Sequence, residues 1–392
     1  MPPLETAGSR IRDTAPTAIP WFIYLAAIGV TGIPVGVLWD ISWHSTIGRD
    51  TFWTPAHLCI HAGGLIPGLT CIALILRLTF WGTDREKAGA VRIWGFHGPL
   101  GAWVVVWGNL AMLTSAPFDD WWHDAYGLDV EIISPPHSVL ALGMFGVALG
   151  VLLLVLACQN NIEESKQARA SLLFNDVAGV LITMLAIMMT EETFPNQQHS
   201  GLFYGIIAST FPVYLALISR ASKGNWGATR SAAIYMGIMA GALWILPLFR
   251  GQPMLAPIYS PVTHMVPPAF PLLLILPAAL FDLLIQRFGK GRIPWWRVLL
   301  LAIPLGALFV GTMLPAQWHF SKFLISDSAQ NRFFAGRAFY PYFSRPGPYQ
   351  KEFWLRNRSA AQPKDIALAA GLGIAASAVG LGIGGWMTRV RR

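Results

Sequence analysis

The stretch "HSVLALGMFGVALGVLLLVLAC", His137 to Cys158, contains no charged residue and is long enough to cross a lipid bilayer as one helix. Apolar runs of similar length recur along the whole chain of 392 residues, which is 54% hydrophobic and only 12% charged. Repeated runs of this kind are typical of membrane-spanning helices rather than of a soluble core. The sequence therefore predicts an all-α protein, a polytopic transmembrane helical bundle.

About ten spanning helices are predicted. Their approximate limits are 20–39, 57–80, 93–115, 137–158, 172–190, 202–219, 232–249, 265–286, 297–314 and 366–387. Most lysines and arginines lie in the two tails and in alternate loops, whereas the four short loops on the other side contain only Arg49 and Arg250. The positive-inside rule then predicts that both termini are cytoplasmic and that the protein lies in an inner (cytoplasmic) membrane. This topology accounts for the net charge of +8 without a nucleic-acid partner.

The sequence predicts neither disulfide bonds nor a cleaved signal peptide. Cys59, Cys71 and Cys158 all lie in or beside apolar runs, so we expect packing residues rather than disulfides or a metal motif. The first apolar run follows a polar tail without a small-residue cleavage site, which indicates a helix that is retained.

Ionisable residues concentrate on one side of the predicted bundle. Eight of the nine histidines fall in the outer loops or the first outer turns of helices: His44, His57, His61, His123, His137, His199, His264 and His319. Many of the acidic residues fall in the same loops. Imidazole and carboxylate groups together, where ions can enter from bulk water, are a ligand set for transition metals.

The spacing of these residues gives two similar sets. Asp40 and His44 are four residues apart at the outer end of the first helix, and His57 opens the second helix. In the second set Asp119 and His123 are again four apart, and His137 opens the fourth helix. A proline precedes each later histidine, in "TPAH" and "SPPH", as expected at a helix start. Each set could close on one metal ion, and the helix N-terminus favours a neutral imidazole that can bind it.

The stretch "DISWHSTIGRDTFWTPAH", Asp40 to His57, resembles the copper-binding signature of the C subunit of particulate methane and ammonia monooxygenases. "DDWWHDAYGLDVEIISPPH", Asp119 to His137, is similar to the second copper site of that family, except that Asp119 stands where the family has asparagine. The added negative charge should favour a more highly charged ion. The resemblance covers about residues 20–160.

The resemblance implies a copper-dependent monooxygenase subunit that uses O2 to insert oxygen into a small apolar substrate reaching it through lipid. It also implies two further membrane monooxygenase-type subunits, one with a cupredoxin-like domain, and metal sites at the periplasmic face. From the residues alone, an Asp/His/His set suits copper, zinc or iron(II), and only the resemblance selects copper.

A non-catalytic copper- or zinc-handling protein, either an assembly factor or a transporter, is the alternative function. The same three ligands would serve an assembly factor. A transporter should instead show ionisable groups stepping through the bilayer, and five of the ten predicted helices (the third, fourth, sixth, seventh and ninth) have essentially none at mid-depth.

Three further residues near the first set have expected roles. Arg49 and Asp50 would form a pair that orients a ligand histidine or a plain surface salt bridge, and His61, one turn from His57, would be either a fourth ligand or a buried histidine. The remaining His199, His264 and His319 lack the paired spacing and are interpreted as interfacial histidines.

The predicted organisation has five parts. A tail, 1–19, precedes the metal-binding module of four helices, 20–160, and a membrane extension of five helices, 161–313. An aromatic and basic outer segment, 314–365, would form a docking surface or a lid, and a last helix with a basic tail follows at 366–392. The glycines and alanines of that helix permit close packing, which suggests homo-oligomerisation or docking to a partner helix.

Overall fold

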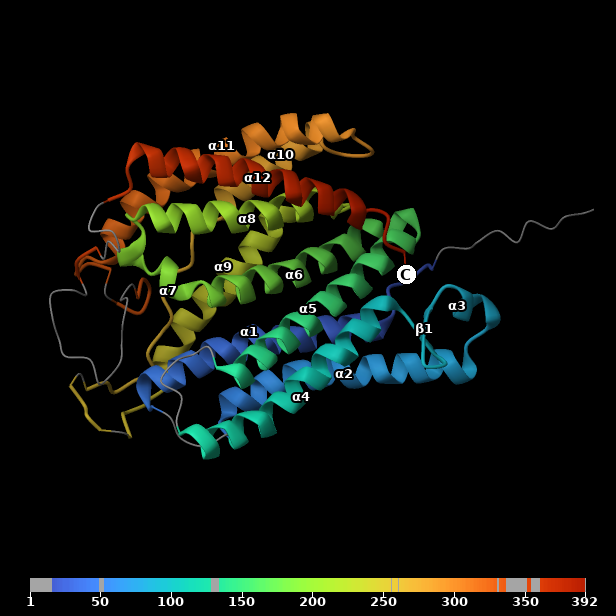
Figure 1. Ribbon diagram of the computed structural model, residues 1–392, viewed down its shortest axis with the longest axis horizontal. Coiled ribbons are helices and arrows are strands. Elements are labelled where there is room, and N and C mark those ends of the chain that lie inside the picture. The colour runs from blue at the N-terminus through green and yellow to red at the C-terminus, as the bar shows by residue number, and fades with distance from the viewer. Residues whose placement is uncertain are drawn as a thin grey trace, which may run out of the picture.

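The computed structural model describes residues 16–48, 53–127, 134–254, 256–259, 261–329, 331–335, 351–353 and 360–391. Within these residues the protein is a bundle of helices with a single short β-hairpin (Figure 1), which confirms the predicted all-α class. Large apolar side chains such as Ile28, Leu69 and Leu142 are exposed on the outside of the bundle. Apolar surface of this extent is expected where lipid, rather than water, surrounds a protein.

Nine helices of the described chain are long and apolar enough to cross a membrane. They are α1 (Trp21–Thr46), α2 (Pro55–Trp81), α4 (Leu100–Tyr126), α5 (Pro135–Asn161), α6 (Glu164–Met188), α8 (Gly201–Ala221), α9 (Gly227–Ile245), α11 (Trp295–Leu324) and α12 (Pro363–Met387). The short elements are α3 (Asp84–Ala88), β1 (Val91–Ile93), β2 (Phe96–Gly98), α7 (Thr190–Thr193), η1 (Pro195–Gln197), η2 (Leu246–Leu248) and α10 (Ile275–Phe288).

The predicted span 265–286 is helical only from Ile275 onward, because prolines interrupt its first half. Pro267, Pro268 and Pro271 lack the N–H groups that a helix needs, and residues 265–274 have no regular secondary structure. Neighbouring side chains replace the missing helical bonds: the N–H of Leu272 donates to the Tyr235 hydroxyl at 2.8 Å, and that of Leu273 donates to Gln317 Oε1 at 3.0 Å.

Residues 265–288, the non-helical segment followed by α10, still run from one end of the bundle to the other. Val266 contacts Thr46 at the end of α1, whereas Asp282 of α10 caps the start of α9, where its carboxylate accepts the N–H groups of Ala228 and Thr229. The start of α1 and the end of α12 accordingly lie at the same end of the bundle (Figure 1). We call this end, with Arg220 and Lys290, the basic end.

Several other boundaries differ from the sequence prediction: α1 and α11 end later, at Thr46 and Leu324, and α6 begins earlier, at Glu164. The differences at α4 bear on the site. The helix expected from residue 93 begins at Leu100, and β1 and β2 occupy the chain before it. The same helix, α4, continues to Tyr126 instead of ending at 115, so Asp119 and His123 lie on a helix and not in a loop. Apolar windows miss such ends because polar residues extend a helix beyond its hydrophobic part.

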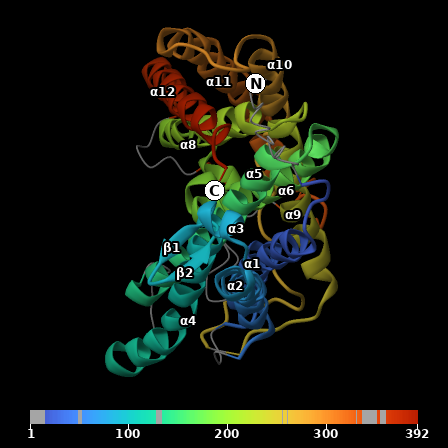
Figure 2. The ribbon, with the colours of Figure 1, turned by 90° about the vertical axis from the view of Figure 1, so that its right-hand side faces the viewer.

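Helices α4 and α5 pack closely through glycines. Figure 2 shows α1, α2 and α4 on one side of the bundle and α10, α11 and α12 on the other. A Cβ atom on Gly108 would lie 2.5 Å from the backbone nitrogen of Val147, and one on Gly150 would lie 2.6 Å from that of Val105. Larger residues at these positions would push the helices apart. This contact fixes α4 against α5 and thereby places Asp119 and His123 relative to His137.

We expect the Gly150→Ala variant to unfold at a lower temperature than Gly237→Ala, in thermal unfolding of the detergent-solubilised protein. Both changes raise helix propensity by about 1 kcal/mol, but overpacking against Val105 should cost about 1–3 kcal/mol, whereas Gly237 on α9 has open space around it. Equal midpoints for the two variants would contradict the close approach of α4 and α5.

Candidate metal centre

The first Asp/His set is built where α1 ends and α2 begins. Asp40 and His44 lie one turn apart on the last turns of α1, and His57 lies in the first turn of α2. Thr54 caps α2, because its side-chain oxygen accepts the backbone N–H of His57 at 3.1 Å, and Pro55 occupies the first helical position. The helix start therefore fixes the backbone of the third candidate ligand directly.

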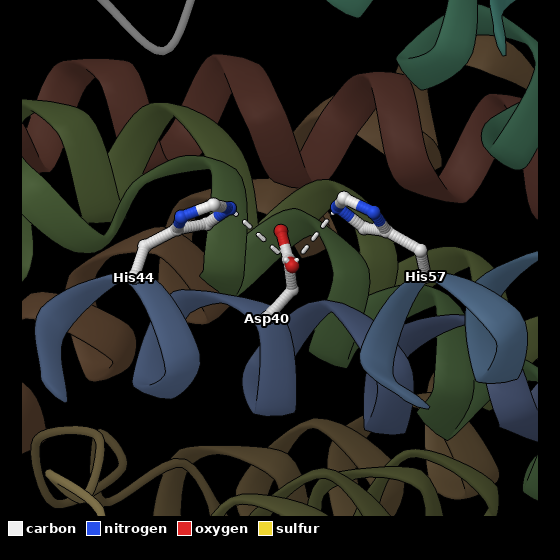
Figure 3. Close-up of side chains that lie close together, drawn as sticks. All are labelled: Asp40, His44 and His57. Carbon is white, nitrogen blue, oxygen red and sulfur yellow. Dashed lines mark ion pairs between the residues drawn. The ribbon is translucent and has the colours of Figure 1, made fainter. Parts of the chain in front are cut away.

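The three side chains converge on the carboxylate. Oδ1 of Asp40 lies 3.5 Å from Nε2 of His44 and 3.1 Å from Nε2 of His57. Figure 3 shows the carboxylate between the two imidazole rings. One ligand atom from each residue lies within 4.8 Å of the others, a spacing that allows all three to bind one ion.

The charge balance of this set fits a cation at its centre. Oδ1 of Asp40 is buried and accepts no hydrogen bond from the described residues, although the side chain as a whole is 21% exposed. A buried carboxylate oxygen is costly in free energy unless a positive charge compensates it, and either a bound cation between the three side chains or a protonated imidazole beside Asp40 would supply that charge. One carboxylate and two imidazoles also form a donor set that copper, zinc and iron(II) accept, so the residues present fit a transition-metal ion.

The second set repeats the construction on α4 and α5. Oδ1 of Asp119 lies 3.3 Å from Nε2 of His123 and 3.6 Å from Nε2 of His137, and it too is buried without a hydrogen bond from the described residues. Ser134 caps α5 by accepting the N–H of His137. Nδ1 of His123 donates to the carbonyl oxygen of Gly127 at 3.1 Å, which leaves Nε2 as the ligand atom.

The two sets differ in the distances among their three candidate ligand atoms. Among the described residues, Asp40, His44 and His57 form the group whose three ligand atoms all lie within 4.8 Å of one another. The second set has similar distances to its carboxylate but does not meet this condition as a whole. The first set is therefore the stronger candidate for a metal centre.

The accessory residues predicted around the first set are only partly described. Arg49 and Asp50 lie outside the described residues. His61 lies one turn further into α2 than His57, is half-buried, and does not belong to the close group of ligand atoms. The geometry thus supports three ligands from the chain, and it assigns no ligand role to His61.

Of the other predicted outer histidines, His199 packs inside the bundle, whereas His264 and His319 are exposed. The His199 ring is stacked between Trp318 at 3.8 Å and Phe353 at 3.6 Å, and its Nε2 donates to the carbonyl oxygen of Trp318. Burial lowers the pKa of His199, which keeps this ring neutral at pH 7. His264 lies in an isolated bridge with Arg250, and His319 is exposed.

A contact from the second half of the chain, which the sequence did not indicate, holds the end of α1. The Thr46 hydroxyl donates to the carbonyl oxygen of Ser42 at 2.6 Å and accepts the N–H of Val266 at 2.8 Å. The N–H of Met254 donates to the carbonyl oxygen of Ile47. Residues 250–266 thereby fix the helical turn that carries His44.

Comparisons of the chain with protein-family models, with curated proteins and with solved structures find no match. The fold and the site together define a multi-pass helical membrane protein with an Asp/His cluster at one end of its bundle, which could hold a metal ion. The residues themselves therefore carry the functional argument.

We expect His57→Ala to lose the metal of the first set and His61→Ala to retain it, when metal content is measured by mass spectrometry on the purified membrane protein. Removing one of three ligands leaves too few donors, whereas His61 lies outside the close group. Metal loss in both variants to the same extent would make His61 a ligand and would contradict this geometry.

Proposed function

We propose that this chain is the metal-binding membrane subunit of a monooxygenase-like complex, which inserts oxygen from O2 into a small apolar substrate. The observation that carries the proposal is the convergence of Asp40, His44 and His57 around a buried carboxylate oxygen that lacks a hydrogen bond from the described residues. The resemblance of residues 40–57 and 119–137 to the C subunit of copper membrane monooxygenases supplies the reaction class.

Copper is the metal that this proposal assigns to the first set, with zinc and iron as alternatives that the donor atoms also accept. When bound, copper supplies the one-electron redox chemistry that the reduction of O2 needs. Asp40 would offset part of the charge of the ion, and His44 and His57 would hold it through neutral nitrogen atoms. Three ligands from the chain leave coordination positions open for O2, as a catalytic rather than a purely structural site requires.

The surroundings of the two sets suit a substrate that dissolves in lipid. Trp53, 73% exposed, precedes α2, and Phe118, Trp121, Trp122 and Tyr126 form a chain of ring contacts at the end of α4. Trp and Tyr are enriched at membrane interfaces, where one side of the ring is apolar and the other is wet. A small hydrocarbon could therefore reach either set from the bilayer without crossing bulk water.

The proposal is tested by measuring copper content and oxygen-dependent product formation together. We expect purified wild-type protein, with the membrane subunits that copurify and a quinol as reductant, to oxidise a small hydrocarbon. His44→Ala and His123→Ala should each remove about one equivalent of metal, as two independent sites require, and His44→Ala should abolish product formation.

Two outcomes would contradict this function. If the wild-type protein is metal-free, or if both variants keep all of their metal, the Asp/His sets are not metal sites. If metal is bound but neither O2 nor substrate is consumed with its partners present, the chain handles copper or zinc without catalysis.

We expect Asp119→Asn to shift the preference of the second set away from divalent ions and toward Cu(I). Losing one unit of negative charge at ligand distance should cost a divalent ion more than about 1.4 kcal/mol, that is, more than about tenfold in affinity. The exposed neighbour Asp120 provides the matched control, Asp120→Asn. Equal affinities of both variants for a divalent ion, in competition titrations with chelators, would exclude Asp119 as a ligand.

A further inference from the structure

The β-hairpin between α3 and α4 has a position that the sequence did not suggest. Its strands pair Val91 with Gly98, Arg92 with His97 and Ile93 with Phe96. Trp94 and Gly95 form the turn with positive φ angles of 49° and 90°, the backbone of a tight two-residue hairpin. A loop at the basic end of a membrane protein would ordinarily project beyond the ends of the helices into water.

Contacts with α2 place the hairpin beside that helix instead. A Cβ atom on Gly98 would lie 2.6 Å from the Ile75 side chain, and Thr79 is hydrogen-bonded to His97. Ile75 lies before the end of α2 at Trp81 by nearly two turns, roughly 9 Å along the helix axis. Figure 1 likewise shows the hairpin alongside the last turns of α2.

Contacts with α4 give the same depth independently. The Trp94 ring at the tip of the hairpin lies 5.6 Å from the Trp107 ring. Trp107 follows the start of α4 at Leu100 by about two turns, roughly 10 Å. The tip therefore points back along the first two turns of α4, as the other contacts of the hairpin lie beside the last two turns of α2.

Backbone groups of the hairpin form hydrogen bonds within the protein, as surroundings without water require. Strand pairing satisfies the inner edge of the hairpin, a side chain of α2 bonds the outer edge of β2, and a side chain of α4 bonds the start of β1. The N–H of His97 donates to Thr79 Oγ1 at 2.8 Å, and Trp103 Nε1 donates to the carbonyl oxygen of Val91 at 3.2 Å. Non-helical backbone is tolerated at membrane depth only with such partners.

The outward surface of the hairpin region is aromatic. Trp94 is 79% exposed, Trp81 76%, Phe80 62% and Phe96 37%. Phe80 contacts both Trp81 and Phe96, so these three rings form one exposed cluster, and Trp94 contacts Trp107 separately. The basic residues Arg85 of α3 and Arg92 of β1 are also exposed. Exposed tryptophans next to arginines match the boundary between acyl chains and anionic headgroups.

We propose that the β1–β2 hairpin is a re-entrant element that lies in the lipid leaflet at the basic end of the bundle. The exposed cluster of Phe80, Trp81 and Phe96, together with Trp94, contacts acyl chains just below the headgroups, and Arg85 and Arg92 meet anionic lipid. The hairpin thereby fixes the depth of α2 and α4, which carry His57 and Asp119 at their opposite ends. This inference stands on the contacts of the hairpin and does not depend on a bound metal.

Spin labelling of the full chain in lipid nanodiscs tests the proposal. A nitroxide is attached at Trp94→Cys or Phe96→Cys, with the exposed Ala88→Cys of α3 as the control outside the hairpin, in a chain whose three native cysteines are replaced by alanine. Collision rates with O2, which partitions into lipid, are compared with those of a water-soluble nickel complex. A single gel-filtration peak confirms that each labelled variant is folded.

We expect O2 to collide more often than the nickel complex at positions 94 and 96, and the reverse at position 88. If the nickel complex collides more often at 94 and 96 as well, the hairpin lies in water and the proposal fails. Poor access of both reagents to 94 and 96 would also overturn it, because another protein surface would then cover the cluster.

Discussion

In a bilayer every backbone N–H and C=O must find a partner within the protein, and this constraint shapes the whole chain. Nine helices of the described residues satisfy it by their own ladders. Two non-helical stretches that lie beside apolar helices form hydrogen bonds to side chains of those helices instead. In the segment 265–274, backbone N–H groups donate to Tyr235 and Gln317. In the hairpin, backbone groups bond to the side chains of Thr79 and Trp103. Some polar side chains inside this bundle therefore serve to bond non-helical backbone, and others form the candidate site.

The same constraint explains why the Asp/His sets lie at helix ends. At a helix start the first N–H groups lack partners, so a capping residue is needed, and Thr54 and Ser134 provide it immediately before His57 and His137. Charged ligands are also far cheaper at the interface than at the centre of the bilayer. Two antiparallel helices that meet at one end can thus bring together a carboxylate and two imidazoles with little strain, and the chain uses this arrangement twice.

The sequence predicted what depends on local composition and spacing. Long apolar runs predicted the helices, and the Asp-x3-His spacing placed Asp40 and His44 on one face at the end of the first helix. The sequence did not show that Asp119 and His123 lie on a helix, because the apolar run ends before them. It failed where tertiary contacts decide. Pro267, Pro268 and Pro271 lie in an apolar run that hydropathy alone interprets as a helix, and the turn at Trp94 and Gly95 is only two residues long. No local pattern links Thr46 to Val266, because their contact depends on how the two halves of the chain fold together.

That last contact gives the second half of the chain a physical relation to the first set. Ser42 and Thr46 lie on the face of α1 roughly opposite to Asp40 and His44, since residues two apart on a helix point to different sides. Thr46 is fully buried against residues 250–266, so the final turns of α1 are held from behind while their other face presents the candidate ligands. A metal centre depends on such support, because loosely held ligands lose both affinity and selectivity. Met254 and Val266, in non-helical chain of the second half, therefore hold the helical turn that carries His44.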